Sequence, residues 1–209
     1  MDFIYVGAAV LVAYLLGSIS FAVVVSRLMG LSDPRTFGSK NPGATNVLRS
    51  GSKVAAILTL LLDAAKGWLP VFLVVQYGDA YGLYSGALAL VGVAAFLGHV
   101  YPIFFKLKGG KGVATALGVV LGISPWLGLA VALTWIIMAV FFRYSSLASV
   151  TAAIFAPFYY VLVSGVAWNM DGIIAAALVF IAGFLLLRHA ENLSRLMKGT
   201  ESKLGSKKK

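Results

Sequence analysis

The chain has 209 residues, of which 60% are hydrophobic and 11% are charged, and its formal net charge is +10. A soluble domain carries about 25% charged residues, so this composition excludes a soluble globular protein. The absence of cysteine excludes a disulfide framework, a thiolate metal site and a cysteine nucleophile. In a membrane protein, positive charge is typical of cytoplasmic loops near anionic lipids. We therefore expect membrane lipids, and no nucleic acid, as partners.

The hydrophobic residues come in long runs, and a helix that crosses a bilayer needs roughly 20 of them. We predict an all-α integral membrane fold, a single polytopic domain over residues 1–209 with seven transmembrane helices. The first charge is Asp2 and no basic segment precedes the first run, which favours an uncleaved first helix. The expected spans are 3–25, 54–77, 81–105, 113–123, 125–142, 147–167 and 172–187, followed by a basic tail over 188–209.

The charges sort the connecting segments onto two sides. With seven spans, residues 26–53, 106–112, 143–146 and the tail share one side and hold 5, 3, 1 and 7 Lys and Arg residues, 16 of the 17. By the positive-inside rule that side is cytoplasmic, the N-terminus is outside and the C-terminus is inside. The fourth span is short, but it has to cross, because otherwise Arg143 and the tail would lie on the wrong side.

The first cytoplasmic segment contains GSKNPGATNVLR at residues 38–49. Ser39 and Asn46 supply a hydroxyl and an amide, and Arg49 supplies the planar fork that suits phosphate. Gly43 allows the backbone to approach a ligand closely. A capped turn with solvated charges is the alternative, but small polar and basic residues are denser here than a turn needs. The segment therefore indicates an anion site.

The second cytoplasmic segment, KLKGGKG at residues 106–112, precedes a predicted helix. Glycines before a helix leave N–H groups pointing toward an anion, and Lys111 adds a positive charge. The segment does not match a nucleotide-binding Walker A loop, because Phe105 and Gly112 occupy positions that require Gly and Ser or Thr. A plain flexible turn remains the alternative interpretation.

The start of the tail reads RHAENLSR at residues 188–195. His189 and Asn192 are three residues apart and so share a helix face, with Arg188, Asn192 and Arg195 forming an adjoining stripe. A single histidine near a membrane surface is often structural. Its polar companions favour a functional role, because histidine is the side chain most used as a general acid or base.

Two further polar pairs have structural interpretations. Asp63 and Lys66 lie three residues apart inside the second span, where isolated charges are costly, and we interpret them as a mutually neutralising pair facing other helices. Ser145 and Ser146 lie in the remaining cytoplasmic turn and are each expected to cap a helix. We nevertheless keep Ser146 among the candidate substrate-binding residues.

Several chemistries are excluded by the motifs. The chain has no GxSxG nucleophile elbow, no HExxH and no cluster with metal-ligand spacing, and we expect neither a metal nor a cofactor. The H-x4-D pattern of one large glycerolipid acyltransferase class is also absent. Because the elaborate polar sequence lies on one side only, an enzyme is favoured over a transporter, which needs polar groups near the midplane and gates on both sides.

The motifs taken together resemble the bacterial acyl-phosphate:glycerol-3-phosphate acyltransferases of the PlsY type. No single segment is specific, but the ordered set spans almost the whole chain. The matching segments are GSKNPGATNVLR at 38–49, DAAKG at 63–67, GHVYPIFFKLKGGKGVATALG at 98–118, RYSSLAS at 143–149 and RHAENLSRLMKGTE at 188–201.

The resemblance implies transfer of a fatty acyl group from acyl phosphate to the 1-hydroxyl of glycerol 3-phosphate. The products are lysophosphatidic acid and phosphate, in a step of phospholipid synthesis at the bacterial cytoplasmic (inner or plasma) membrane. The active site is then expected to face the cytoplasm, and a cytosolic or peripheral enzyme is expected to supply the acyl phosphate. No covalent nucleophile is needed, because acyl phosphate is already an activated anhydride.

Under this resemblance each candidate residue has an expected role. The expected catalytic residues are His189, Asn192, Ser39 and Arg49. His189 is a candidate general base, although a substrate phosphate could serve instead. The expected substrate-binding or phosphate-binding residues are Gly43, Asn46, Lys108, Gly109, Gly110, Lys111, Thr115, Ser146 and Arg188.

Two rival functions remain open from the sequence. The basic loops could form the vestibule of an organic-anion or phosphate-ester transporter, which would move a labelled phosphate ester into vesicles without making product. The chain could also be a scaffold that docks cytosolic lipid enzymes through its basic tail. In that case conservative changes at Arg49 or Lys111 would leave lipid synthesis intact.

Overall fold

The computed structural model describes residues 3–205, and within them the secondary structure is helical, without a β-strand. Residues 1–2 and 206–209, including Asp2 and the end of the basic tail, lie outside the described residues. The α-helices are α1 (Phe3–Gly17), α2 (Phe21–Leu28), α3 (Ala44–Leu48), α4 (Lys53–Tyr77), α5 (Ser85–Val100), α6 (Val113–Ile123), α7 (Pro125–Phe142), α8 (Ser145–Leu162), α9 (Gly172–Arg188) and α10 (Ala190–Met197), with short 3-10 helices η1 (Gly78–Tyr81) and η2 (Ile103–Phe105).

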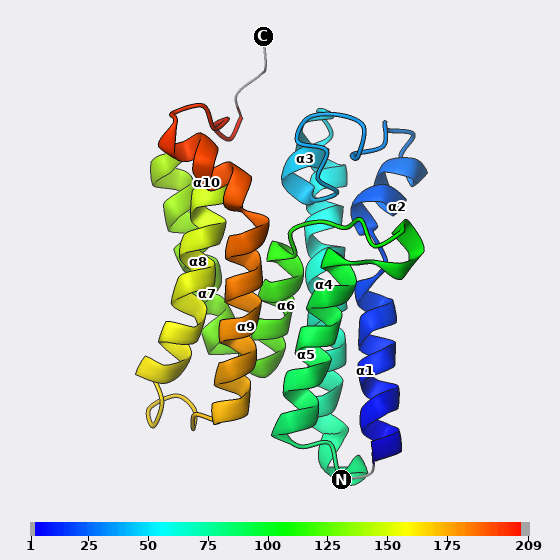
Figure 1. Ribbon diagram of the computed structural model, residues 1–209, viewed down its shortest axis with the longest axis vertical. Coiled ribbons are helices and arrows are strands. Elements are labelled where there is room, and N and C mark those ends of the chain that lie inside the picture. The colour runs from blue at the N-terminus through cyan, green and yellow to red at the C-terminus, as the bar shows by residue number, and fades with distance from the viewer. Residues whose placement is uncertain (1–2, 206–209) are drawn as a thin grey trace.

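The helices form two groups with α6 between them. Figure 1 shows α1, α4 and α5 on one side and α7, α8 and α9 on the other, all running along the long axis. Helix α6 packs closely against α4, because Gly118 lies on the backbone of Ala64 and Gly67 lies on the backbone of Thr115. A Cβ at either glycine would overlap a carbonyl oxygen. These glycines therefore let the short helix join the two groups.

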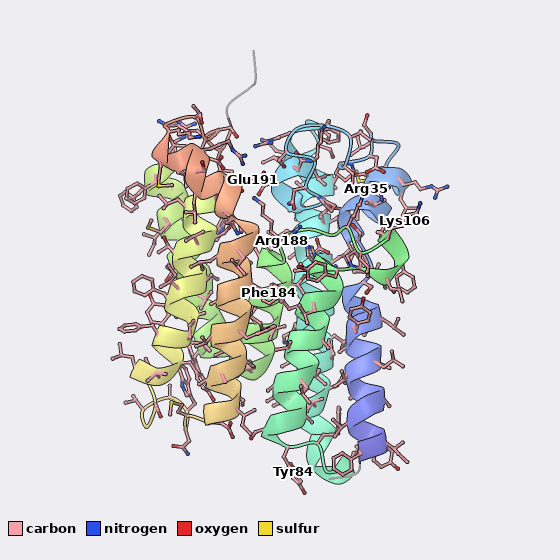
Figure 2. The ribbon with its side chains drawn as sticks, viewed as in Figure 1. Arg35, Tyr84, Lys106, Phe184, Arg188 and Glu191 are labelled. Atoms are coloured by element: carbon pink, nitrogen blue, oxygen red, sulfur yellow. The ribbon has the colours of Figure 1, made fainter. Side chains whose placement is uncertain are left out.

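Most of the irregular chain gathers at one end of the bundle, here called the polar end. It carries α2, α3, α10, residues 29–43, residues 101–112 and residues 198–205 (Figure 1). Figure 2 shows the labelled Arg35, Lys106 and Glu191 at the polar end and Tyr84 at the opposite end. Segments that are far apart in sequence thus share one face, which is what the charge distribution predicts.

Helix lengths bear on the predicted number of spans. Among the described residues, four helical segments are long and apolar enough to cross a membrane, and up to six if each of two bent pairs counts as one span. The bent pairs are α1 with α2, at 44°, and α9 with α10, at 56°. Helix α6, at 11 residues, is about 16 Å long against a hydrocarbon layer of about 30 Å. An integral membrane bundle is therefore evident, while seven crossings stay a prediction.

The span expected over 3–25 is not one continuous helix, because the helix breaks after Gly17. At that point Gly17 lies directly on the backbone of Ala95, and the chain bends. The break frees the carbonyl of Ile19, which accepts a hydrogen bond of 2.6 Å from Lys66 Nζ. Lys66 also pairs with Asp63 at 2.9 Å, and both side chains are buried. The charged pair is thus internal, as expected, and Lys66 additionally stabilises the break.

Two other predicted spans differ at their ends from the observed helices. Helix α5, which corresponds to the span expected over 81–105, ends at Val100, because Tyr101 and Pro102 leave the helical conformation. Helix α8, which corresponds to the span expected over 147–167, begins at Ser145 and ends at Leu162. Its N-cap residue is Tyr144, so neither Ser145 nor Ser146 occupies the capping position. The expected capping roles are therefore wrong. The hydroxyl of Ser146 is used by a partner in the tail, described below.

Candidate active site

The loop before α6 is hydrogen-bonded to the C-terminal end of α5. Gly109 N–H donates to the carbonyl of Val100 and Gly110 N–H donates to the carbonyl of His99, both at 3.2 Å. A Cβ at Gly109 would overlap the His99 carbonyl, and one at Gly110 would overlap the His99 ring. The two amides are therefore engaged with backbone and are not the free anion donors that the sequence predicted. The N–H groups of the first turn of α6, which by helix geometry have no intrahelical acceptor, remain for that role.

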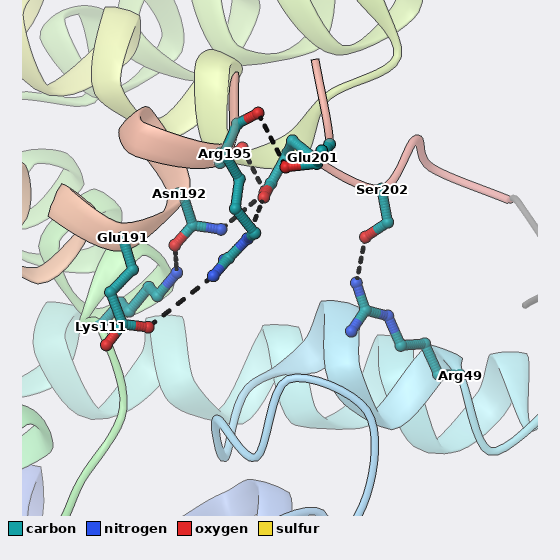
Figure 3. Close-up of polar contacts among 9 residues, drawn as sticks. Arg49, Lys111, Glu191, Asn192, Arg195, Glu201 and Ser202 are labelled. Atoms are coloured by element: carbon teal, nitrogen blue, oxygen red, sulfur yellow. Dashed lines mark hydrogen bonds and ion pairs between the residues drawn. The ribbon is translucent and has the colours of Figure 1, made fainter. Parts of the chain in front are cut away.

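Lys111 joins this loop to α10. Its ammonium donates to Asn192 Oδ1 (Figure 3). One turn earlier, Arg188 lies beside the loop, with its guanidinium 3.4 Å from the carbonyl oxygens of Gly109 and Gly110. Two segments separated by more than 70 residues thus meet, as the sequence predicts for parts of one site.

His189 occupies the break between α9 and α10 and is buried. Its Nδ1 lies 2.8 Å from the carbonyl of Leu185. A carbonyl only accepts, so Nδ1 carries the proton and Nε2 is the ring's acceptor. Burial, aided by the charge of Lys111, lowers the pKa of His189 to about 4. At neutral pH the ring is therefore uncharged, with Nε2 able to accept a proton.

Glu201 places a carboxylate among the candidate residues, and the sequence analysis did not single it out. It accepts hydrogen bonds from Asn192 Nδ2 at 2.6 Å, Arg195 Nε at 2.7 Å and Ser146 Oγ at 2.8 Å (Figure 3). Although burial alone would raise the pKa of Glu201, the hydrogen bonds hold it below its ordinary value. The adjacent Ser202 accepts from Arg49 at 2.8 Å. The tail thereby connects α8, α10 and Arg49 at the C-terminal end of α3.

The segment before Arg49 is organised by Asn46. This buried amide donates to the carbonyls of Pro34, at 2.6 Å, and Phe37, at 3.2 Å, and accepts from the Ser39 N–H at 3.0 Å. Asn46 therefore fixes the loop that presents Ser39, whose side chain is exposed. Gly43 precedes α3 at its N-cap position. In this arrangement Asn46 positions Ser39.

The candidate site contains more cationic side chains than acidic ones. Burial lowers the pKa of Lys111 to about 8, while Glu201 raises it and Arg195 lowers it. Glu191 forms a wide ion pair with Arg195 at 3.8 Å. Within residues 3–205, no group of three or more His, Asp or Glu side chains is arranged to hold a metal ion. The chemistry that these residues can perform is anion binding and proton transfer.

Comparison with known proteins identifies the family. The glycerol-3-phosphate acyltransferase family model matches residues 7–199. The chain is 68% identical to a glycerol-3-phosphate acyltransferase of Albidiferax ferrireducens over 200 residues, which are 96% of this chain and 89% of the relative. It is 60% identical to that of Bordetella petrii, over 99% and 97% of the two chains. The chain belongs to the glycerol-3-phosphate acyltransferase family.

Solved structures agree with this family assignment. Crystal structures of PlsY, an integral membrane glycerol 3-phosphate acyltransferase, match in a glycerol 3-phosphate form and in a lysophosphatidic acid form. Their TM-scores are 0.88 and 0.86 at 40% and 39% identity, and each match covers 96% of both chains. The predicted acyltransferase class and membrane location are therefore confirmed, and the transporter alternative is not favoured.

Not every predicted residue of this acyltransferase joins the cluster around Lys111 and Asn192. Thr115 is fully buried against α4, where it packs on Gly67. Lys108 is exposed and lines a separate cavity with Lys40, toward α2 and η2. The cluster around Lys111 and Asn192 therefore contains fewer of the predicted residues than the motifs suggest.

Two residues that contact or support the candidate site escaped the sequence analysis. Glu201 had a weak signal, as one of the few acids in a basic tail, but its partners depend on the tail folding back over α8 and α10. His99 was considered only for the excluded H-x4-D pattern, yet its carbonyl and ring support Gly110 from beneath. Its Nδ1 also lies 3.7 Å from Asp63 Oδ1, so the loop rests on the buried charged pair.

Proposed function

We propose that this acyltransferase moves a fatty acyl group from acyl phosphate to the 1-hydroxyl of glycerol 3-phosphate at the cytoplasmic face, releasing lysophosphatidic acid and phosphate. The observation that carries the proposal is the meeting of four separate polar segments. Lys111 contacts Asn192, Ser146 and Asn192 share Glu201, and Arg49 reaches Ser202 of the same tail. A reaction between two phosphorylated substrates needs such a convergence of anion-binding groups.

The matched structures support the choice of acceptor and product. One is PlsY in a glycerol 3-phosphate form and the other is in a lysophosphatidic acid form. In this chain, Lys111, Arg188 and Arg49 are the cations that we assign to the substrate phosphates. The acyl chain stays among the helices in the hydrocarbon layer, so only the reacting carbonyl comes to the polar end.

At the acyl carbon, the transfer step makes one C–O bond and breaks another. The 1-hydroxyl oxygen attacks the acyl carbonyl carbon and forms the ester C–O bond, while the bond from that carbon to the phosphate oxygen breaks and its electron pair leaves with phosphate. Acyl phosphate is activated, so much of the rate arises from holding the reactants in line and from stabilising charge. We assign charge stabilisation to Lys111 and Arg49, and orientation of the hydroxyl to Asn192.

The hydroxyl proton has two possible acceptors. His189 Nε2 is unprotonated at neutral pH, because Nδ1 donates to Leu185 and the pKa of the ring lies at about 4. A substrate phosphate, with a second pKa near 6, is a comparable base. The geometry supports His189 as an acceptor without requiring it.

For the membrane arrangement we propose seven crossings, with the N-terminus outside and the polar end in the cytoplasm. The chain alternates direction through α1, α4, α5, α6, α7, α8 and α9 (Figure 1), so α6 counts as a crossing although it is short. The location of 16 of 17 Lys and Arg residues supports the orientation. A cytosolic or peripheral enzyme then delivers acyl phosphate to this face.

A two-substrate assay tests the proposal. Purified protein receives glycerol 3-phosphate with either acyl phosphate or acyl-CoA, and both phosphate and lysophosphatidic acid are measured. We expect the two products in equal amounts from acyl phosphate and little product from acyl-CoA. Lys111→Met is expected to lose most activity, whereas Lys53→Met, an exposed lysine at the start of α4, serves as the matched control. Faster transfer from acyl-CoA would refute the proposed donor.

A further inference from the structure

A cavity of about 540 Å³ lies at the polar end beside α2 and η2. Four cations line it, and two aromatic rings complete the wall: Arg35, Lys40, Lys106 and Lys108, with Phe104 and Phe105. In Figure 2 the labelled Arg35 and Lys106 lie toward α2, away from Glu191 on α10. The cavity is therefore separate from the cluster around Lys111 and Asn192, although it reaches the same loop at Gly109.

The cavity has an excess of positive charge. Arg35 is paired with Asp33 at 2.6 Å and stacks over the Phe105 ring at 5.3 Å. Lys40, Lys106 and Lys108 are exposed, and none of them forms an ion pair within residues 3–205. Three such lysines that line one cavity repel one another, so an anion that enters between them is stabilised.

Exposed apolar side chains adjoin the same cavity: Phe104 lines it, and Ile103 and Leu107 are next to lining residues in the chain. Ile103, Phe104 and Leu107 are 54%, 61% and 55% exposed. Between Phe105 and Lys108 the chain turns through two left-handed residues, Lys106 and Leu107, with φ of 54° and 59°. Cations next to exposed apolar groups at a membrane surface suit a ligand with a phosphate and an acyl chain. A soluble anion has no acyl chain that could cover these apolar side chains.

We propose that this cavity binds the phosphate headgroup of an anionic phospholipid from the surrounding bilayer, at a site distinct from the acyl-transfer site. The headgroup lies between Lys40, Lys106 and Lys108, and an acyl chain runs over Ile103 and Phe104 into the hydrocarbon layer. The lipid is a bound component of the bilayer and takes no part in the acyl transfer.

Native mass spectrometry of the detergent-purified protein, titrated with phosphatidylglycerol or phosphatidylcholine, tests this site. We expect phosphatidylglycerol to bind more tightly. The double variant Lys40→Gln/Lys106→Gln should weaken its binding at least about fivefold, since each lysine near a headgroup contributes on the order of a fivefold factor. The control Lys53→Gln/Lys198→Gln removes the same charge from exposed lysines outside the cavity and should change binding less than about twofold.

Three results would overturn the proposal: equal weakening in the control, equal binding of phosphatidylcholine, or displacement of phosphatidylglycerol by millimolar glycerol 3-phosphate. The last would assign the cavity to a soluble phosphate. If the double variant does not elute as a folded protein on size exclusion, Lys106→Gln alone is titrated against Lys53→Gln. Acyl transfer in detergent by the double variant should match wild type, so failure of this site and failure of the proposed function are distinguishable.

Discussion

The charge of Lys111 makes the enzyme's alkaline pH dependence a direct probe of the site. Burial lowers the pKa of this ammonium from 10.5 to about 8. A lysine with a lowered pKa keeps its charge below that value and loses it as pH rises through it. Because the proposed phosphate grip needs the charged form, kcat/KM for glycerol 3-phosphate should fall above pH 8.

The size of the fall follows from the protonated fraction of the free enzyme. With a pKa of about 8, the charged fraction drops roughly fivefold from pH 8 to 9 and about tenfold over the next unit, and kcat/KM should follow it. An unperturbed lysine would leave the profile flat over most of this range. The substrate phosphates, with second pKa values near 6, are already ionised there and do not contribute.

Replacing Lys111 by arginine separates this explanation from others. Arginine stays charged throughout the accessible pH range, so the alkaline limb should move up by more than about one unit, whatever rate is lost through the changed shape. Lys53→Arg is the matched control and should keep the wild-type limb. The assay is phosphate release from acyl phosphate at subsaturating glycerol 3-phosphate, corrected for hydrolysis without enzyme. An unshifted limb in Lys111→Arg would refute the assignment.

Three further variants test individual parts of the account. His189→Ala, assayed with both substrates saturating, should lose about 100-fold in kcat if the ring is the general base; near-normal turnover would assign that role to a substrate phosphate. Gly110→Ala forces a Cβ against the His99 ring and should raise the KM for glycerol 3-phosphate several-fold, whereas Gly183→Ala, whose Cβ meets nothing, should leave it unchanged. Asp63→Asn leaves the buried Lys66 without its counter-charge and should cost about 3–5 kcal/mol of stability, seen as a lower unfolding temperature; an unchanged temperature would show that the pair does not stabilise the fold.

Much of the framework was predictable because its signals are local. Proline suits the first turn of a helix, so Pro125 predicts the boundary between α6 and α7. The spacing of Asp63 and Lys66 predicts a pair on one helix face. The common side of the basic segments follows from counting charges, although the number of crossings does not follow from helix length alone.

The remaining features depend on contacts between distant segments. Ser18 and Ser20 mark the break after Gly17 only weakly within a long apolar run. Gly17 packs there on the backbone of Ala95, and Lys66 donates a hydrogen bond to the Ile19 carbonyl. The Gly110 amide was expected to be free but is taken by the His99 carbonyl, which a motif cannot reveal. Glu201 contacts Ser146, 55 residues away. Such pairings are set by how the helices pack.

Single-cysteine labelling tests most directly whether the polar segments share one membrane face. The chain has no native cysteine, so Lys106→Cys, Glu191→Cys and Val166→Cys each place one thiol at an exposed position. A membrane-impermeant maleimide is applied to vesicles of known orientation. We predict that positions 106 and 191 react from the cytoplasmic side and position 166 from the opposite side. If positions 106 and 191 react from opposite sides, their segments cannot hold a common substrate, and the proposed active site is contradicted.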